Sequence, residues 1–264
     1  MKIVQQHIAR HQTRFHDHPF FARLDKDPPL DQLAPFPFCF TFFALAFQDI
    51  LRTCDERVTH PDFKRMVHRH RLEDAGHDRW FLADLATLGI EPPTGTQMFA
   101  PAHDAARRAG FALMSEALGA RHDACVLTLL LAIESTGHVF FERIARYIAR
   151  IGETRRLRYF SQSHLDVEMA HDVFEKDTDA QIESLALAPE VREEALQLVD
   201  RCYRELTAMY DGIEAQIAAH ASGAASVRSR PRPGIGAGLH ASAAPSLRPF
   251  ARRAPARDGA RRTR

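Results

Sequence analysis

The sequence has few of the features that mark disulfide-rich, zinc-binding or membrane-spanning proteins. Its four cysteines are scattered and none forms a C-x-x-C pair, which argues against a disulfide framework or zinc knuckle and favours a reducing compartment. The N-terminal segment MKIVQQHIARHQ lacks the apolar core of a signal peptide. The apolar stretch 33–47 is about 15 residues long and contains two prolines, whereas a spanning helix needs roughly 20. We therefore expect a cytoplasmic protein without a transmembrane segment.

The net charge of +1 conceals an uneven distribution along the chain. Residues 221–264 hold ten of the 35 basic side chains, all arginine, and one of the 34 acidic ones, so their net charge is +9 and that of residues 1–220 is −8. This Arg-, Ala- and Pro-rich segment has too few large apolar groups to form a core. We expect a disordered tail at 221–264 after a folded domain at 1–220. Weak contact with nucleic acid or anionic lipid is the alternative role for the tail, and nucleic acid is otherwise not an expected partner.

Alternating strand patterns are nearly absent, and almost every periodic segment has a helical period. The chain is long enough for one good-sized core. The fold class predicted is therefore all-α, a compact bundle of seven helices with short connections. The expected helices cover residues 2–15, 38–54, 61–88, 101–118, 121–151, 153–176 and 189–219. The Phe-rich segment 38–47 either belongs to the core or lines an apolar substrate channel.

The segment 159–174 contains His164, Glu168 and His171 at spacings of four and three, which places them on one face of a helix. The same face carries aromatic residues, so the three polar groups are expected in a buried stripe. Buried polar groups need partners, and one metal ion can partner all three. Two imidazoles and a carboxylate are a ligand set for non-haem Fe(II). The alternative is two satisfied core histidines and a solvated glutamate.

Two further helices carry groups of the same kind. In the predicted helix 61–88, His70, Glu73 and His77 share a face, and Asp74 lies about one position further around the helix. That run could also be a solvated surface. Gly76 costs about 1 kcal/mol relative to alanine inside a helix, which favours close packing or an approaching ligand there.

In 121–151, Glu134 follows a nearly unbroken apolar run, with His138 one turn later. A carboxylate in such a buried stripe is paired, protonated or bound to metal. The predicted metal ligands from the three helices are Glu73, His77, Glu134, His164, Glu168 and His171, with His70, Asp74 and His138 as alternative or supporting groups. This set is enough for two metal ions, and a mixture of nitrogen and oxygen without sulfur favours iron or manganese over structural zinc.

These residues resemble the haem-oxygenase-like di-iron oxidases and oxygenases, also called iron-containing redox enzymes. The family pattern is a Glu and a His from the first core helix, a Glu from the second, and His-x3-Asp/Glu-x2-His from the third. The resemblance covers roughly residues 35–220. The segments that carry it are LEDAGHDRWFLADL with Glu73 and His77, LLLAIES with Glu134, and HLDVEMAH with His164, Glu168 and His171. The carboxylate of the third core helix is most often Asp in the family, whereas it is Glu168 here. The spacing from Glu73 to His77 on the first core helix is only four, so Asp74 or His70 could take the place of Glu73.

The resemblance implies a seven-helix haem-oxygenase-like bundle that binds two iron ions, with Glu134 bridging them. It implies an O2-dependent oxidoreductase that oxidises a small organic substrate, of fatty-acid-like or amine- and amino-acid-like type. Manganese would use similar ligands, and a homodimer is compatible with the sequence. These points are expectations for the structure and for experiment.

Other classes of protein remain open from the residues alone. A true haem oxygenase needs one proximal histidine and would leave the other polar groups unexplained. A thiamin-degrading type of hydrolase needs an activated cysteine. A ferritin-like bundle usually brings Glu-x-x-His from two helices, whereas Glu73–His77 and Glu134–His138 are both four residues apart. The non-enzymatic alternative is an iron-binding or helical interaction protein of the same fold.

Overall fold

Helices make up all the regular secondary structure of the residues described. The computed structural model describes residues 1–170 and 182–223, and within them it contains ten α-helices, two short 3-10 helices and no strand. The α-helices are α1 (Lys2–His16), α2 (Pro19–Leu24), α3 (Pro35–Arg57), α4 (Pro61–Glu73), α5 (His77–Leu88), α6 (Gly95–Met98), α7 (Asp104–Gly119), α8 (Asp123–Arg150), α9 (Gln162–Ala170) and α11 (Pro189–Ala221). The 3-10 helices are η1 (Leu30–Leu33) and η2 (Pro101–His103). The predicted all-α class is confirmed.

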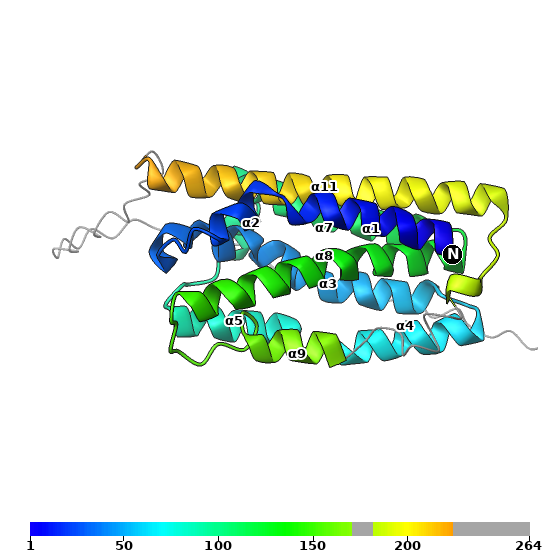
Figure 1. Ribbon diagram of the computed structural model, residues 1–264, viewed down its shortest axis with the longest axis horizontal. Coiled ribbons are helices and arrows are strands. Elements are labelled where there is room, and N and C mark those ends of the chain that lie inside the picture. The colour runs from blue at the N-terminus through cyan, green and yellow to red at the C-terminus, as the bar shows by residue number, and fades with distance from the viewer. Residues whose placement is uncertain (171–181, 224–264) are drawn as a thin grey trace, which may run out of the picture. The chain divides into compact units, whose positions relative to one another are not determined.

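The long helices pack lengthwise into one bundle (Figure 1). Helices α1 and α11 lie together along one edge, α3 and α8 run through the middle, and α4, α5 and α9 lie along the opposite edge. All of them belong to one compact unit that spans Met1–Ser226. The tail predicted at 221–264 lies outside the described residues from position 224 onward.

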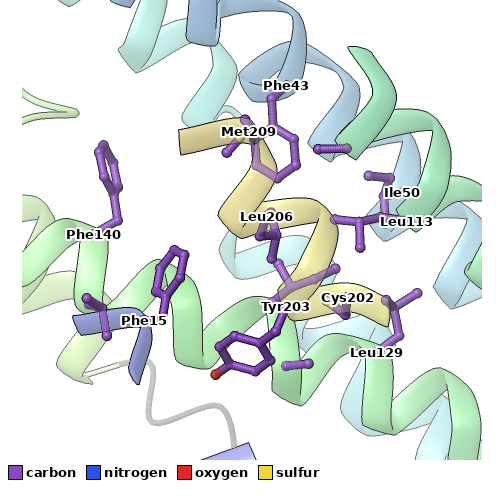
Figure 2. Close-up of a cluster of buried hydrophobic side chains, with 14 of the residues drawn as sticks. Phe15, Phe43, Ile50, Leu113, Leu129, Phe140, Cys202, Tyr203, Leu206 and Met209 are labelled. Carbon is purple, nitrogen blue, oxygen red and sulfur yellow. The ribbon is translucent and has the colours of Figure 1, made fainter. Parts of the chain in front are cut away.

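The core forms where α11 packs against α3, α7 and α8. Figure 2 shows Cys202, Leu206 and Met209 of α11 among side chains of these helices, including Phe43 and Leu113. The three α11 positions follow spacings of four and three, so they form one apolar stripe, and each is at most 2% exposed. Burying a large apolar side chain stabilises the fold by about 1.5–3 kcal/mol.

Helix α8 has the length and apolar composition of a membrane-spanning helix. However, 67% of its most apolar window is buried inside the bundle, as expected for the central helix of a folded core. A helix that is apolar on nearly all sides must be covered on nearly all sides. In this bundle the neighbours α1, α7, α9 and α11 all pack against α8.

The segment 61–88, predicted as one helix, forms two helices, because the backbone leaves the right-handed helical conformation at Gly76. Gly76 has φ of +95°, a left-handed conformation that other residues adopt only with strain. Helix α4 therefore ends at Glu73 and α5 begins at His77. The glycine thus separates two helices instead of lying inside one. This break and the short helices α2 and α6 account for the difference from the seven helices predicted.

The helix predicted over 153–176 begins later, at Gln162. Gly152 is left-handed, with φ of +66°, and ends α8. The chain then contacts Asp84 of α5. The Asp84 carboxylate accepts hydrogen bonds from the backbone N–H groups of Arg158 at 2.8 Å and Phe160 at 3.0 Å. A segment whose N–H groups bind a side chain cannot donate them to a helix. The connection 151–161 is therefore non-helical apart from turns.

Candidate metal centre

Three side chains between α4 and α8 bring metal-binding atoms close together in the protein interior. The Nε2 atom of His70 lies 3.1 Å from Oε1 of Glu134 and 3.5 Å from Oδ2 of Asp74. One ligand atom from each residue lies within 4.8 Å of the others. His70 and Asp74 are each 3% exposed, and Glu134 is half-buried. One imidazole and two carboxylates at this separation could surround a single iron or manganese ion.

Two more histidines extend this group along the bundle. His77 begins α5, and its Nδ1 atom lies 3.8 Å from Oδ1 of Asp74. The Asp74 carboxylate therefore faces His70 with one oxygen and His77 with the other. His164 of α9 lies next to His77, with 4.5 Å between the ring centroids. Both histidines are buried. Five nitrogen- or oxygen-bearing side chains thus meet where α4, α5, α8 and α9 come together.

The orientation of His164 is fixed by a chain of hydrogen bonds that begins on α5. The Nδ1 atom of His164 donates to the carbonyl of Tyr159 at 2.7 Å, because a carbonyl can only accept. In the neutral ring the proton then lies on Nδ1, so Nε2 is the nitrogen that could bind a metal ion. The Asp84 carboxylate holds the backbone on both sides of Tyr159, and burial raises the pKa of this carboxyl. Outer partners of this kind set the tautomer and direction of ligating histidines.

Glu73, predicted as a ligand, lies outside this group. Its carboxylate accepts a hydrogen bond from Nε of Arg69 at 2.7 Å, one turn earlier on α4. The prediction assumed a continuous helix from Glu73 to His77, whereas Gly76 breaks the helix between them. His70 and Asp74, named only as alternatives, occupy the inner face of α4 instead.

The other predicted residues differ in how far the structure describes them. His77, Glu134 and His164 are brought together with His70 and Asp74, as described above. His138, a supporting candidate on α8, is exposed and takes no part in the group. Glu168 lies in α9, but its side chain is not among the parts described. His171 lies outside the described residues.

An apolar cavity of about 60 Å³ borders the group. Asp74, His77 and Glu134 supply its polar wall, and three phenylalanines of α3 line it: Phe40, Phe43 and Phe47. The Phe-rich segment of the sequence thus serves both as core and as cavity wall. A cavity of this size admits water and O2, since about 10–15 Å³ is enough for one water molecule.

A larger cavity of about 340 Å³ lies beyond a layer of aromatic rings. Phe36 and Phe160 line this second cavity, and Phe40 and Phe140 line the first. The Phe36 ring lies 5.6–6.0 Å from the rings of the other three, measured between centroids. Aromatic side chains therefore lie between the two cavities.

All four cysteines are buried and unpaired. Burial raises the pKa of Cys39 and Cys125 to about 11 and that of Cys54 to about 12, and it also raises the pKa of Cys202. A nucleophilic cysteine needs the opposite shift, toward the thiolate. The cysteines therefore do not support a thiamin-degrading type of hydrolase.

We expect a thiol reagent such as DTNB to leave all four cysteines unmodified in the folded protein at pH 8. The thiols remain protonated and are covered by the core, so reaction must await unfolding. Four thiols should react rapidly in guanidinium chloride, which provides the control. Fast modification of one cysteine in the native protein would restore the hydrolase alternative.

The sequence matches no protein-family model, and no curated protein is significantly similar to it. Function is therefore inferred from the residues and their arrangement.

Proposed function

We propose that this protein is a non-haem di-iron oxidase or oxygenase on a haem-oxygenase-like bundle, which uses O2 to oxidise a small organic substrate. The observation that carries the proposal is the buried convergence of His70, Asp74 and Glu134, with His77 and His164 directly beside them. Their donor atoms are nitrogen and oxygen only, which suits iron. Manganese is the other metal that this ligand set would accept.

The two ions would share this group of ligands. His70, Asp74 and Glu134 would hold one ion, and His77 and His164, with Glu168 and His171 as expected from the sequence, would hold the other. Three carboxylates would offset most of the charge of two Fe(II) ions. Bound iron supplies the redox chemistry by which O2 is activated.

The protein's own residues would exclude water from the site and orient the metal ligands. Phe40, Phe140 and Phe141 face the cavity from α3 and α8 and exclude water from its apolar side. Excluding water strengthens the electrostatic interactions between charged ligands and metal. The Asp84–Tyr159–His164 chain holds one imidazole in the ligating tautomer. Both cavities are lined mostly by apolar side chains, with Asp31 and Arg155 at the second, and this lining favours a fatty-acid-like substrate over a polar amino acid.

Anaerobic loading with Fe(II), followed by exposure to O2, tests the proposal. We expect about two irons per chain, as the ligand set requires, then O2 consumption with a transient visible absorption band. A protein that retains no iron would overturn the proposal. Iron that is retained without O2 consumption would also overturn it, in favour of a non-catalytic iron-binding protein.

We expect Asp84→Asn to weaken the metal centre without removing a ligand. The amide offers one acceptor oxygen, and its NH2 group would oppose the second backbone N–H of the connection 158–160. Loss of an outer partner of a ligating histidine lowers metal affinity about 10–100-fold, which iron titration would measure. Asp49→Asn, at an exposed aspartate of α3, is the matched control. Unchanged affinity in Asp84→Asn would show that His164 needs no such support.

A further inference from the structure

We propose a second metal site, distinct from the buried centre, on the surface where α1 meets α11. His7 and His11 of α1 and Asp200 of α11 form the site, which would take Zn²⁺ or another late first-row divalent ion. The Nε2 atoms of His7 and His11 lie 2.6 Å and 2.7 Å from the same oxygen of Asp200, Oδ1. One ligand atom from each of the three residues lies within 4.8 Å of the others.

The local structure explains why the three side chains converge. His7 and His11 are four residues apart, so they lie one above the other on a single face of α1. That face packs against α11, where Asp200 projects between the two rings. Two imidazole nitrogens and one carboxylate are the ligand set of many three-residue zinc sites, which keep a fourth position for water. The histidine side chains are about one-fifth exposed and Asp200 is 53% exposed, so water can reach that position.

The site is held in place by neighbours that contribute no ligand. The His11 ring stacks on Tyr203 of α11 with 4.9 Å between centroids and 25° between planes. The Tyr203 hydroxyl in turn hydrogen-bonds Ser135 of α8. A ring fixed in this way has little rotational freedom to lose when it binds an ion. The structure therefore offers a largely preformed site rather than three mobile surface side chains.

Binding of an ion requires a proton to move from one nitrogen of the His7 ring to the other. Arg10 donates a hydrogen bond to Nδ1 of His7 at 3.2 Å, so the neutral His7 carries its proton on Nε2 and donates it to Asp200. Zn²⁺ binding at Nε2 requires that this proton move to Nδ1, which displaces Arg10. Arg10 is exposed and can turn into solvent. Arg10 thus competes with the metal, both for the ring nitrogen and through its charge.

An ion at this site would join the first helix to the last long helix of the bundle. Helix α1 also packs against α8 and α11 through buried apolar residues such as Val4 and Ile8, and Gln12 donates a hydrogen bond to a backbone carbonyl of α8 at 2.9 Å. A bond through metal between α1 and α11 would oppose local opening of α1, because an ion that binds only the closed form stabilises it. The site would be a structural metal site that links α1 to α11, and it would take no part in O2 chemistry.

Zinc binding to the full-length protein tests the site. Equilibrium dialysis with Zn²⁺ should reveal a site whose affinity falls at least tenfold in His7→Gln and in Asp200→Asn. The same site should persist in Glu134→Gln, which alters the buried centre, and in the matched control His16→Gln on α1. Arg10→Gln should bind several-fold more tightly.

Hydrogen exchange locates the ion independently. Zn²⁺ should slow exchange of the α1 amides several-fold in the wild type and not in His7→Gln. Zinc affinity that is insensitive to His7→Gln and Asp200→Asn, or α1 amides that do not respond to Zn²⁺, would overturn the site. Weaker binding in Arg10→Gln would contradict the proton account. None of these results depends on whether the buried centre holds iron.

Discussion

Asp74→Asn is expected to abolish iron binding at one position of the buried centre, while Glu73→Gln, one residue earlier, leaves it intact. Asp74 is 3% exposed, with one carboxylate oxygen toward His70 and the other toward His77. An amide cannot supply the negative charge that the ion requires. Since changes to outer partners of ligands already cost about 10–100-fold in affinity, loss of this carboxylate should cost more than about 100-fold. Glu73 instead pairs with Arg69, one turn earlier on α4.

Metal analysis of the two purified variants after anaerobic Fe(II) loading makes this comparison. Both substitutions replace an acid by its amide, so size and helix propensity change little. Circular dichroism should show the same helix content for both. Loss of iron from Glu73→Gln with retention by Asp74→Asn would reverse the assignment and support the ligand set expected from a continuous helix.

Phe140→Ala is expected to cause the largest loss of stability, about 3–5 kcal/mol of unfolding free energy. Phe140 lies on α8 and is 3% exposed. Its ring lies 5.0–6.5 Å, between centroids, from five other aromatic rings: Phe36, Phe40, Phe141, Tyr159 and Tyr210. The substitution leaves a void among rings that cannot all collapse to fill it. It also removes part of the layer that separates the two apolar cavities.

Urea unfolding followed by circular dichroism measures the effect. Phe111→Ala is the matched control, because the Phe111 side chain is 56% exposed and a surface substitution usually changes stability by less than about 0.5 kcal/mol. If both variants lost the same stability, Phe140 would not be a central packing residue. An apolar dye that binds only Phe140→Ala would show that the two cavities have joined.

The long helices could be predicted from the sequence because their signals are local. Helix α8 was expected over 121–151 and spans Asp123–Arg150, and α11 was expected over 189–219 and spans Pro189–Ala221. The break at Gly76 was not predicted, because a glycine inside a helical pattern is compatible with either a kink or an end. Helices α4 and α5 each pack against α3 on either side of this left-handed glycine.

The same break limits what could be predicted about the buried centre. Glu134 and His164 stand out because each is a polar residue in an apolar stripe. His77 lines the same cavity as Glu134, and its ring contacts that of His164. The choice between Glu73 and Asp74 depended on helix phase, which Gly76 changes.

The surface group on α1 was missed for a different reason. The His-x3-His spacing of His7 and His11 is visible in the sequence, but its third member, Asp200, lies almost two hundred residues away. Only the packing of α1 against α11 brings it close. Local spacing can therefore suggest half of a ligand set, and the tertiary fold decides whether the set is completed.

Anomalous diffraction from crystals of the anaerobically iron-loaded protein tests the central claim most directly. Data collected on both sides of the iron absorption edge distinguish iron from other ions. We predict anomalous peaks within bonding distance, about 2.0–2.3 Å, of the His70 imidazole and of the Asp74 and Glu134 carboxylates. Absence of iron density at these residues, or iron density only at His7, His11 and Asp200, would contradict the account of a buried iron centre.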